Sequence, residues 1–296
     1  MNILLTGSTG FVGRSILSIL SENNLIFTLS RSNSDYNIDL KSIKPSFNQY
    51  FETVIHSAGL AHFYPKTDEE IELFYEINVI GTLNLLSGLE SGEIPKNFVF
   101  MSTVAVYGES NGTMIKESSK LNALDPYGKS KLEAEKIILN WCANKKVKCT
   151  ILRLPLVVGS NPPGNLGFMI RGIKRGFYFN ILGGNARKSM VLAEDVAQYI
   201  LKAAEVGGVF NLTDGVHPSF FELSLHIADK LRKTTPFNLP FCFAKIFALC
   251  GDIIGPNAPI NSLKLNKVIS DLTFDDSKAR SEFGWNPTPV LLGIKV

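Results

Sequence analysis

Cysteine is scarce in this chain of 296 residues, which contains only Cys142, Cys149, Cys242 and Cys250. None of them forms a C-x-x-C pair or stands at zinc-finger spacing from a histidine, so we expect neither a disulfide framework nor a metal site. Few, scattered cysteines fit a reducing cytoplasm, where we expect the protein to reside. The sequence opens with an apolar strand instead of a basic and then apolar leader, so we expect no signal peptide.

Charge of one sign is also lacking. The chain has 30 lysines and arginines against 27 aspartates and glutamates, which gives a net charge of +3. A block of about five or six like charges, typical of interaction tails and nucleic-acid patches, does not occur. We therefore expect no nucleic-acid partner.

The sequence has no hydrophobic run long enough to cross a bilayer. Its most apolar stretch, residues 239–255, is interrupted by Lys245 and Asp252 and is shorter than a transmembrane helix. The favoured interpretation of this stretch is an amphipathic helix that covers the protein core. A helix that contacts a membrane surface is the alternative.

The first half of the chain alternates apolar strands with helical patterns. This alternation indicates βαβ crossovers, so the predicted fold class is α/β, a Rossmann-like doubly wound parallel sheet. The pattern changes after residue 155. We expect a mainly dinucleotide-binding domain over 1–155 and a smaller, mainly substrate-binding region over 156–296, with segments that return to the sheet. The main expected elements are strands over 2–6, 25–29, 53–56, 97–102 and 148–154, and helices over 11–21, 70–89 and 127–141.

A glycine-rich loop follows the first expected strand. Residues 3–13 read I-L-L-T-G-S-T-G-F-V-G, which places Gly7, Gly10 and Gly13 at G-x-x-G-x-x-G spacing. Gly7 would allow a tight turn, Gly10 would let the backbone approach a pyrophosphate, and Gly13 would let the helix pack on the strand. The N-terminus of that helix would offer N–H groups to the phosphates. The loop therefore predicts a bound dinucleotide, NAD or NADP.

The end of the second strand bears on the choice between these two cofactors. An acidic residue there would bind the ribose 2′-hydroxyl of NAD, whereas an arginine suits the 2′-phosphate of NADP. Here the strand ends in L-S-R-S, with Arg31 in third place, and the first carboxylate follows only at Asp35. Arg31, with Arg14 after the third glycine, therefore favours NADP. The alternative is that Arg31 stacks on the adenine or is solvated.

Tyr127 and Lys131 stand four residues apart in an expected helix and so share one of its faces. A lysine ammonium beside the phenol would favour the phenolate and lower the pKa of Tyr127 from about 10 toward the working pH. A general base for an alcohol needs this property. The preceding strand ends in Ser102 and Thr103, at the carboxyl edge of the sheet, where open α/β folds bind ligands.

Several motifs support one resemblance over nearly the whole length. They are T-G-S-T-G-F-V-G at 6–13, H-S-A-G at 56–59, N-V-I-G-T at 78–82, S-T-V-A-V-Y-G at 102–108, Y-G-K-S-K at 127–131, R-L-P-L-V-V-G at 153–159 and G-W-N-P at 284–287. Together they resemble the extended short-chain dehydrogenases/reductases, the nucleotide-sugar epimerase/dehydratase family. The resemblance implies a homodimer formed through the helices over 70–89 and 127–141.

The resemblance also implies roles for the matching residues. Tyr127 would be the acid/base, Lys131 would hold the cofactor ribose and tune Tyr127, and Thr103 would bond the reacting hydroxyl. Asn78 would lie near the nicotinamide. The expected cofactor contacts are Gly7, Thr9, Gly10, Phe11, Val12, Gly13, Arg14, Arg31, Asp39, Leu40, Ser57, Ala58, Gly59, Asn78, Ser102, Tyr127, Lys131 and Pro155.

The same resemblance implies a site for a substrate diphosphate. Asn165, in G-N-L-G-F-M, resembles the asparagine that meets the diphosphate in this family. Lys188 stands where the family usually has an arginine, and Arg187 directly precedes it. We expect these residues and Thr103 to bind the substrate, and ordinary solvation of the loop is the alternative reading.

The expected substrate is a UDP-sugar, and two reactions remain open for it. Val104 and Ala105 stand where dehydratases of this family carry an acidic pair, so dehydration is disfavoured. The V-Y-G at 106–108 resembles hexose 4-epimerases. The favoured function is therefore epimerisation at C4 of a UDP-hexose through a 4-keto intermediate.

The alternative is an NADPH-dependent reductase of a nucleotide-linked 4-keto-6-deoxy sugar. Arg31 favours it, as do H-S-A-G-L-A-H at 56–62 and N-A-R-K-S-M-V at 185–191, which resemble bacterial sugar reductases of polysaccharide pathways. A non-catalytic dinucleotide-binding regulator is disfavoured because Tyr127 and Lys131 are both present.

Overall fold

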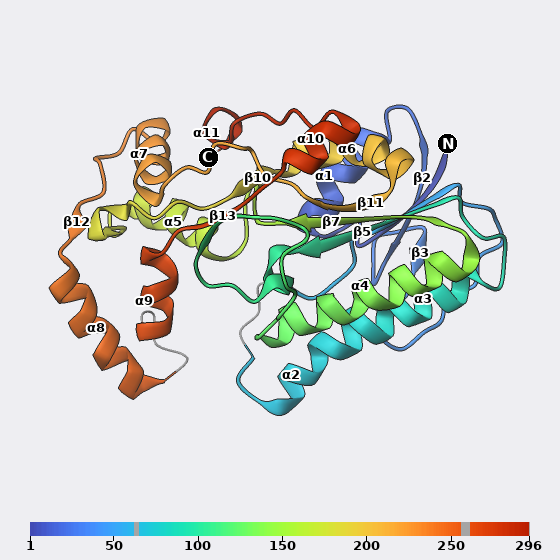
Figure 1. Ribbon diagram of the computed structural model, residues 1–296, viewed down its shortest axis with the longest axis horizontal. Coiled ribbons are helices and arrows are strands. Elements are labelled where there is room, and N and C mark those ends of the chain that lie inside the picture. Colours follow the sequence, from blue (N-terminus) through green and yellow to red (C-terminus); the bar gives the residue numbers. More distant parts are fainter. Residues whose placement is uncertain (62–64, 256–260, 296) are drawn as a thin grey trace.

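A parallel sheet of seven strands forms the centre of the computed structural model (Figure 1). The structure describes residues 1–61, 65–255 and 261–295, so His62 at the end of the motif 56–62 lies outside the described residues. The strand order β11-β7-β5-β4-β1-β2-β3 confirms the predicted Rossmann-like α/β fold. The bounds are β1 (Asn2–Thr6), β2 (Leu25–Ser30), β3 (Tyr36–Asn37), β4 (Thr53–His56), β5 (Asn97–Thr103), β7 (Lys148–Leu154) and β11 (Gly208–Asn211).

The sheet has a switch point beside β1. β2 and β3 lie on one side of β1, whereas β4, β5 and β7 lie on the other. In open parallel sheets such a reversal leaves a crevice beyond the carboxyl ends of the strands, where ligands bind. Thr6 and His56 are the last paired residues of β1 and β4, so the loops that follow them flank this crevice.

Helices cover both faces of the sheet (Figure 1). They are α1 (Phe11–Leu20), α6 (Ala193–Val206) and α10 (Ser277–Phe283) on one face, and α3 (Gly81–Leu89) and α4 (Pro126–Lys145) on the other. The side chains of β1 divide between the two cores because successive strand residues point to opposite faces. Ile3 and Leu5 pack under α1 and α6, and Leu4 packs under α3 and α4. Burial on both faces explains the continuous apolar strands.

The expected single helix over 70–89 is three segments in the structure. It consists of α2 (Asp68–Tyr75), a π-helical turn (Glu76–Ile80) and α3. Thr67 begins α2 as its N-cap, where its side chain accepts from the Glu70 N–H at 3.3 Å. Apolar spacing does not distinguish a π-turn from regular helix, and such turns occur frequently at functional sites.

Helix α4 begins at Pro126, one residue before the expected start, because the residue that caps it, Asp125, directly precedes it. The Asp125 carboxylate accepts from the Gly128 N–H at 2.9 Å, which satisfies one of the free donors of the first turn. Pro126 occupies the first helical position, where its missing N–H costs no hydrogen bond. These capping interactions fix where α4 begins and so fix the position of Tyr127 in its first turn.

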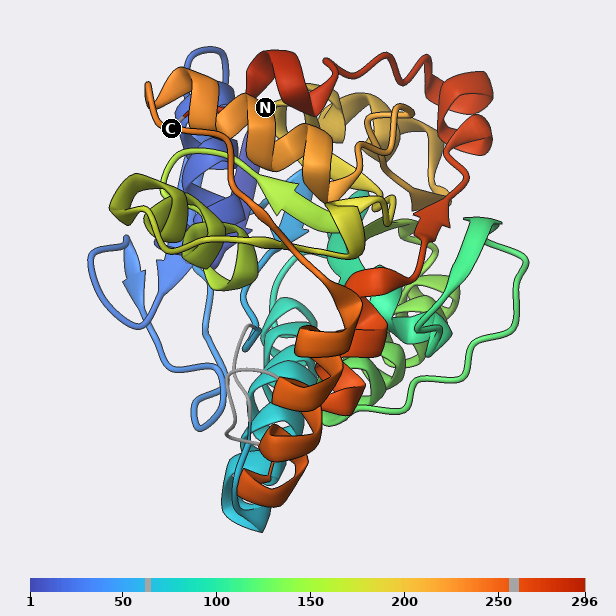
Figure 2. The ribbon, with the colours of Figure 1, turned by 90° about the vertical axis from the view of Figure 1, so that its left-hand side faces the viewer.

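The rest of the chain forms a second region at the left of Figure 1, which faces the viewer in Figure 2. Its strand pairs are β8 (Leu156–Val158) with β10 (Met190–Leu192), β9 (Asn180–Ile181) with β12 (Asn238–Leu239), and β6 (Gly112–Ile115) with β13 (Leu272–Phe274). Its helices are α5 (Gly164–Arg175), α7 (Phe220–Lys230), α8 (Phe241–Ile254), α9 (Ser262–Ile269) and α11 (Val290–Gly293). Short 3₁₀ turns are Val104–Tyr107 and Leu182–Gly184.

Part of this second half returns to the main sheet. β11 pairs with β7, and α6 lies beside α1 over the first core. The domain division at residue 155 stays a prediction.

The apolar stretch over 239–255 differs from its favoured interpretation. It contains α8, whose Ala244 and Ala248 are buried, but whose larger apolar side chains are mostly exposed. Within the described ranges, no helix is both long and apolar enough to pass through a bilayer.

Candidate active site

The glycine loop forms a tight cradle at the switch point. Gly7 has a φ of 70°, a conformation that favours glycine, and a Cβ on it would lie 2.6 Å from the Ala58 nitrogen. A Cβ on Gly13 would lie 2.0 Å from the Gly7 oxygen, so α1 packs directly on the turn. Gly10 is the N-cap of α1, and because glycine has no side chain, it leaves the N–H groups of the first turn uncapped. These features fit a dinucleotide pyrophosphate.

The loop after β4 meets the same crevice from its other side. Ser57, Ala58 and Gly59 follow His56 in this loop, and the Ala58 N–H donates to the Thr6 hydroxyl at 3.1 Å. A Cβ on Gly59 would lie 2.9 Å from the Asn78 Oδ1 and 3.8 Å from the Lys131 Nζ. A side chain at position 59 would therefore intrude between these two polar groups.

Asn78 ties three segments together from the π-helical turn. It is 2% exposed, and its Oδ1 accepts from the Leu60 N–H at 2.7 Å. Its Nδ2 donates to the Ser130 hydroxyl at 2.9 Å, and Ser130 in turn donates to the Tyr127 carbonyl at 2.8 Å. The loop after β4 is thus fixed relative to the first turn of α4.

Tyr127 and Thr103 form the reactive edge of the site. Thr103 ends β5, and a side-chain hydrogen bond joins its hydroxyl to the Tyr127 phenol. Burial raises the pKa of Tyr127 to about 12, although the Thr103 hydrogen bond opposes this rise. The expected lowering by Lys131 is therefore not found in the chain alone. The phenol remains protonated at neutral pH and can donate to a substrate oxygen.

Lys131 is a buried amine beneath the crevice. It is 5% exposed, and its Nζ lies 3.8 Å from the centroid of the Phe100 ring, within cation–π range. Burial lowers its pKa to about 7, while the nearby Glu135 carboxylate opposes this fall. The amine therefore changes its charge near neutral pH.

A buried ion pair between α4 and β7 supports this region. The Arg153 guanidinium contacts the Glu135 carboxylate through two hydrogen bonds, Nε to Oε1 at 3.1 Å and Nη2 to Oε2 at 2.7 Å. Glu135 also accepts from the Ser102 hydroxyl, and Arg153 donates to the Tyr107 hydroxyl at 3.0 Å. Tyr107 then donates to Asn211 at 2.7 Å, which links β5, α4, β7 and β11.

The sequence did carry a signal for this network. Glu135 stands four residues after Lys131 and so shares its helix face. Arg153 opens the motif at 153–159. His56 is a further structural group, which its sequence motif does not indicate. Its ring nitrogens pair with the Thr6 and Thr82 hydroxyls at 2.7 and 2.9 Å, and burial lowers its pKa to about 3.

After the end of β2, Arg31 does not pair with the nearby Asp35 carboxylate. The Asp35 carboxylate accepts from the N–H and the hydroxyl of Thr28 at 2.8 and 2.7 Å, and these bonds lower its pKa. Arg31 is exposed, and the described part of the chain gives its side chain no hydrogen-bond or ion-pair partner. Arg14 donates to the Thr9 carbonyl at 3.0 Å and so lies along the glycine loop.

The remaining expected cofactor contacts lie around the same edge. The Phe11 ring lies 3.2 Å from the position of a Cβ on Gly159, and Val12 packs into the first core. Pro155 joins β7 to β8. Their contacts with a cofactor stay predictions.

Asp39 and Leu40 make local contacts of their own. The Asp39 carboxylate accepts from the Lys41 N–H at 3.2 Å. Leu40 is buried in the second core, and its carbonyl accepts from the Asn84 side chain at 2.7 Å. The structure thus explains both positions without an adenine, and their adenine contacts stay predictions.

The residues expected at a substrate diphosphate have different surroundings. Asn165 is exposed in the first turn of α5. Arg187 donates to the His217 carbonyl at 3.1 Å. The Lys188 Nζ donates to the carbonyl oxygens of Lys267 at 2.9 Å and Ser270 at 2.7 Å, at the end of α9. Burial lowers the pKa of Lys188 to about 8.

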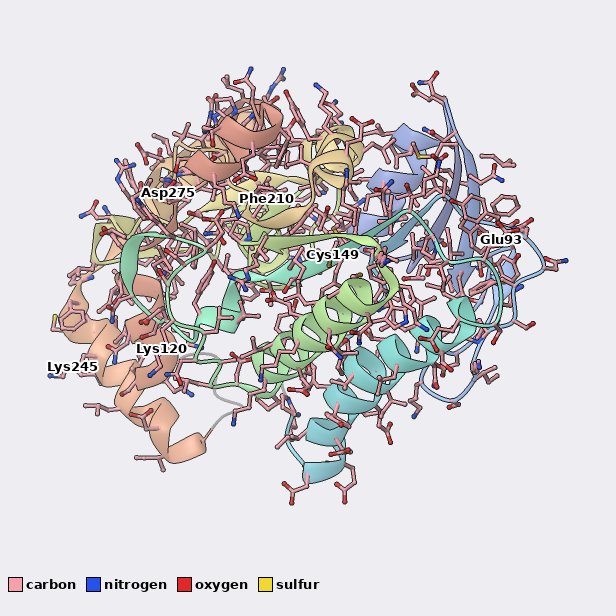
Figure 3. All side chains as sticks on the ribbon, turned by 45° about the vertical axis from the view of Figure 1, so that its right-hand side comes forward. Glu93, Lys120, Cys149, Phe210, Lys245 and Asp275 are labelled. Carbon is pink, nitrogen blue, oxygen red and sulfur yellow. The ribbon has the colours of Figure 1, made fainter. Side chains whose placement is uncertain are left out.

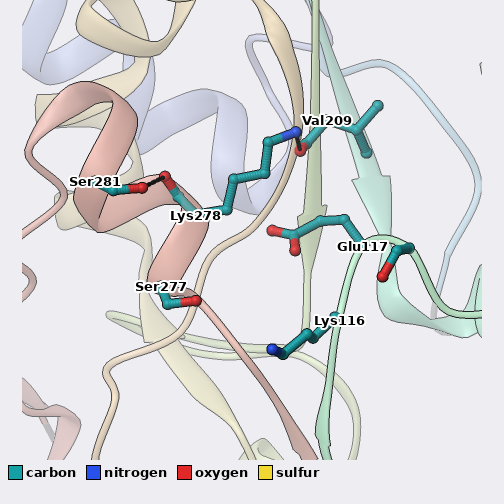
Figure 4. A pocket seen from close by; sticks show the side chains of 7 residues that line it. Lys116, Glu117, Val209, Ser277, Lys278 and Ser281 are labelled. Carbon is teal, nitrogen blue, oxygen red and sulfur yellow. Dashed lines mark hydrogen bonds between the residues drawn. The ribbon is translucent and has the colours of Figure 1, made fainter.

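A surface cavity of about 680 Å³ lies apart from these groups (Figure 4). Lys278 crosses it and donates to the Val209 carbonyl at 3.0 Å. The lining residues are Lys116, Glu117, Ser118, Val209, Ser277, Lys278 and Ser281, none of which belongs to the Tyr127 site. Among the described residues, no group of three or more His, Cys, Asp or Glu is arranged to hold a metal ion.

The lowered pKa of Lys131 predicts a pH-dependent contribution to stability. Between about pH 10 and about pH 7 the unfolded chain binds a proton at this lysine that the folded chain does not bind, so stability falls as the pH falls. Lys131→Met removes this penalty. We expect the melting temperature of the variant, relative to wild type, to be higher at pH 7 than at pH 10.

The exposed Lys129 on the same helix provides a matched control. Lys129→Met should change the melting temperature equally at both pH values. An equal change for Lys131→Met would contradict the lowered pKa.

Comparison with known proteins assigns the chain to a family. The family model described as the NAD dependent epimerase/dehydratase family matches residues 3–212. The chain is 28% identical to an N-acetyl-alpha-D-glucosaminyl-diphospho-ditrans,octacis-undecaprenol 4-epimerase of Escherichia coli O157:H7, over 95% of this chain and 89% of that protein. It is also 28% identical to a UDP-glucose 4-epimerase of Vibrio cholerae, over 98% of this chain and 92% of that protein.

Solved structures share the fold over nearly the whole length. MoeE5 in complex with UDP-glucose and NAD aligns with a TM-score of 0.78 and 21% identity, over 99% of this chain and 96% of that chain. RMD from Pseudomonas aeruginosa complexed with NADPH aligns with a TM-score of 0.74 and 22% identity, over 98% and 94%. The family match covers the glycine loop, Asn78, Thr103 and the Tyr127–Lys131 pair. The chain belongs to the NAD dependent epimerase/dehydratase family.

Proposed function

We propose that the protein epimerises C4 of a nucleotide-linked sugar, with a UDP-hexose as the substrate and NAD or NADP as the cofactor. The observation that carries this proposal is the Tyr127 phenol beside the Thr103 hydroxyl at the carboxyl end of β5, with Lys131 buried nearby. Two adjacent hydroxyl groups can hold a substrate alcohol that is oxidised to a carbonyl and then reduced again to an alcohol. The curated relatives support C4 because both are described as 4-epimerases.

The chain's own residues account for the proton transfers of this reaction. Thr103 would accept from or donate to the substrate oxygen, and Tyr127 would take its proton and return it. A bound nicotinamide would supply the hydride acceptor and donor. When Lys131 is charged, its positive charge favours the phenolate form of Tyr127. This effect would counter the rise in pKa that burial causes.

The second candidate is NADPH-dependent reduction of a nucleotide-linked 4-keto-6-deoxy sugar. Asp35 is held by Thr28, so Arg31 can meet a 2′-phosphate without a competing carboxylate. A solved neighbour that carries NADPH is compatible with this candidate.

Substrate binding is proposed for Asn165, Arg187 and Lys188. Lys188 would have to leave two backbone carbonyls to reach a diphosphate.

A homodimer in the cytoplasm completes the proposal. The outer side of α3 and α4 forms a groove of about 510 Å³ that includes Leu83 and Trp141, and the neighbouring Leu139 is exposed. Such a half-apolar surface suits a symmetric contact with a second copy. The four cysteines are free in the structure, as expected of a reducing compartment.

The choice of cofactor follows from Arg31. Arg31→Ala should weaken the binding of NADP by about 1.5–3 kcal/mol, the contribution of a hydrogen bond to a charged group, and should leave NAD nearly unchanged. Titration calorimetry with both dinucleotides measures this difference. Lys44→Ala, which removes an exposed positive charge at a position outside the expected cofactor contacts, serves as the charge control. Equal weakening of both cofactors would contradict the assignment.

The epimerase proposal is tested by incubating the purified protein and NAD with UDP-glucose, UDP-galactose and their N-acetylamino forms. Appearance of the C4 epimer supports it. Reduction of a 4-keto sugar by NADPH without epimer formation would favour the second candidate instead.

A further inference from the structure

Helix α8 presents an apolar surface to the outside of the molecule. Ala244 and Ala248 face inward, where they pack with Leu265 of α9. The large apolar side chains of α8 are exposed around the rest of the helix. They are Phe241, Phe243, Ile246, Phe247, Leu249 and Ile253, with exposed fractions from 38% to 89%.

This apolar surface continues beyond α8 through the strand pair that precedes it. β12 runs into α8 and pairs with β9. Beside this pair, Phe237 and Phe179 place their rings 5.7 Å apart, and both are exposed at 61% and 36%. The two views in Figures 1 and 2 place β12 and α8 at the same end of the molecule, away from α1 and α6. We call Phe179, Phe237 and the six exposed α8 residues the α8 surface.

Basic residues accompany the α8 surface. Residues 232–255 contain Arg232, Lys233 and Lys245, all exposed, and a single acidic residue, Asp252. The Asp252 carboxylate accepts from the N–H and the hydroxyl of Ser262 at 2.9 and 2.5 Å, and its single negative charge leaves this segment net positive. Figure 3 shows Lys245 at the outer side of α8. The surface therefore combines exposed aromatic rings with net positive charge.

This combination discriminates between the possible occupants. α8 has 14 residues, about 21 Å at 1.5 Å per residue, which is too short to cross a bilayer core. A symmetric contact with a second copy would place the same positive charges on both sides of one interface, which is unfavourable. An anionic lipid surface complements both the aromatic groups and the basic residues.

We propose that the α8 surface docks onto the surface of an anionic lipid bilayer, with α8 lying in the plane of the interface. This inference is independent of the reaction proposed above. Docking would place the second region against the lipid, because α8 packs on α9, and the carbonyl at the end of α9 accepts from Lys188. The chain would remain a peripheral protein.

Sedimentation of the full chain with unilamellar vesicles tests the proposal. We expect binding to phosphatidylcholine vesicles that contain about 30% phosphatidylglycerol, and weaker binding to phosphatidylcholine alone or at high salt. Phe243→Asp with Phe247→Asp, which share one helix face, should lower the partition coefficient at least about tenfold. Leu25→Asp, at a leucine that is 58% exposed on β2, is the matched control and should bind as wild type does.

A further variant and two further measurements make the test decisive. Lys245→Glu should reduce binding to the anionic vesicles only, and circular dichroism establishes that each variant is folded. Absence of vesicle binding by wild type, or equal loss in Leu25→Asp, would overturn the proposal. A fall in the molar mass of the free protein in the double variant, measured by light scattering, would assign the surface to self-association instead.

Discussion

Tyr127→Phe is expected to lower kcat by about 10²- to 10⁴-fold, the range for loss of a general acid/base. The ring would remain beside Phe74, whose centroid lies 6.1 Å away, so the change removes the hydroxyl and keeps the packing. Because the pyrophosphate cradle is formed by the glycine loop and not by Tyr127, cofactor affinity should stay near that of wild type. Steady-state kinetics with fluorescence titration of the cofactor measures both quantities.

Tyr178 provides the matched control for this variant. Burial also raises its pKa to about 12, but it belongs to the α5 side of the molecule and not to the Thr103 edge. Tyr178→Phe should retain near-normal kcat. Turnover near wild type in Tyr127→Phe would remove Tyr127 from the mechanism.

The second large effect concerns the buried ion pair. Glu135 and Arg153 are 1% and 3% exposed, so Arg153→Met would leave a buried carboxylate without its partner. Removal of one member of such a pair costs about 3–5 kcal/mol, because the remaining charge is desolvated and uncompensated. We expect a loss of this size in the free energy of unfolding, measured by urea denaturation.

A double variant separates the pair from a loss of packing. Glu135→Gln combined with Arg153→Met removes both charges and should recover much of the lost stability. The exposed Lys136–Glu133 pair at 3.5 Å is the comparison, since Lys136→Met should cost at most about 1 kcal/mol. A loss below about 1 kcal/mol in Arg153→Met would show that the buried pair does not support α4.

Much of this arrangement could be predicted from the sequence. The strands over 53–56 and 148–154 have the predicted bounds, because strands buried on both faces produce continuous apolar runs. The turn at Gly7 and the close packing at Gly13 also follow the predicted roles, since both depend on the absence of a side chain. Local chemistry determined these features.

Other features depend on contacts that the sequence does not display. The π-turn around Asn78 depends on hydrogen bonds to Leu60 and Ser130, which are distant along the chain. The raised pKa of Tyr127 depends on burial by the folded chain, which outweighs the opposing effect of the Thr103 hydroxyl. Likewise, apolar spacing in α8 could not show that the second region leaves most of that helix uncovered.

Epimerisation in deuterated water, followed by proton NMR, tests the central claim most directly. If Tyr127 moves only the hydroxyl proton and the C4 hydrogen is carried through the cycle, UDP-galactose or its N-acetylamino form should arise from the C4 epimer without deuterium at C4. The same reaction should be lost in Tyr127→Phe. Deuterium at C4 of the product, or no C4 epimer from any of these substrates in the presence of NAD, would contradict the proposed epimerase.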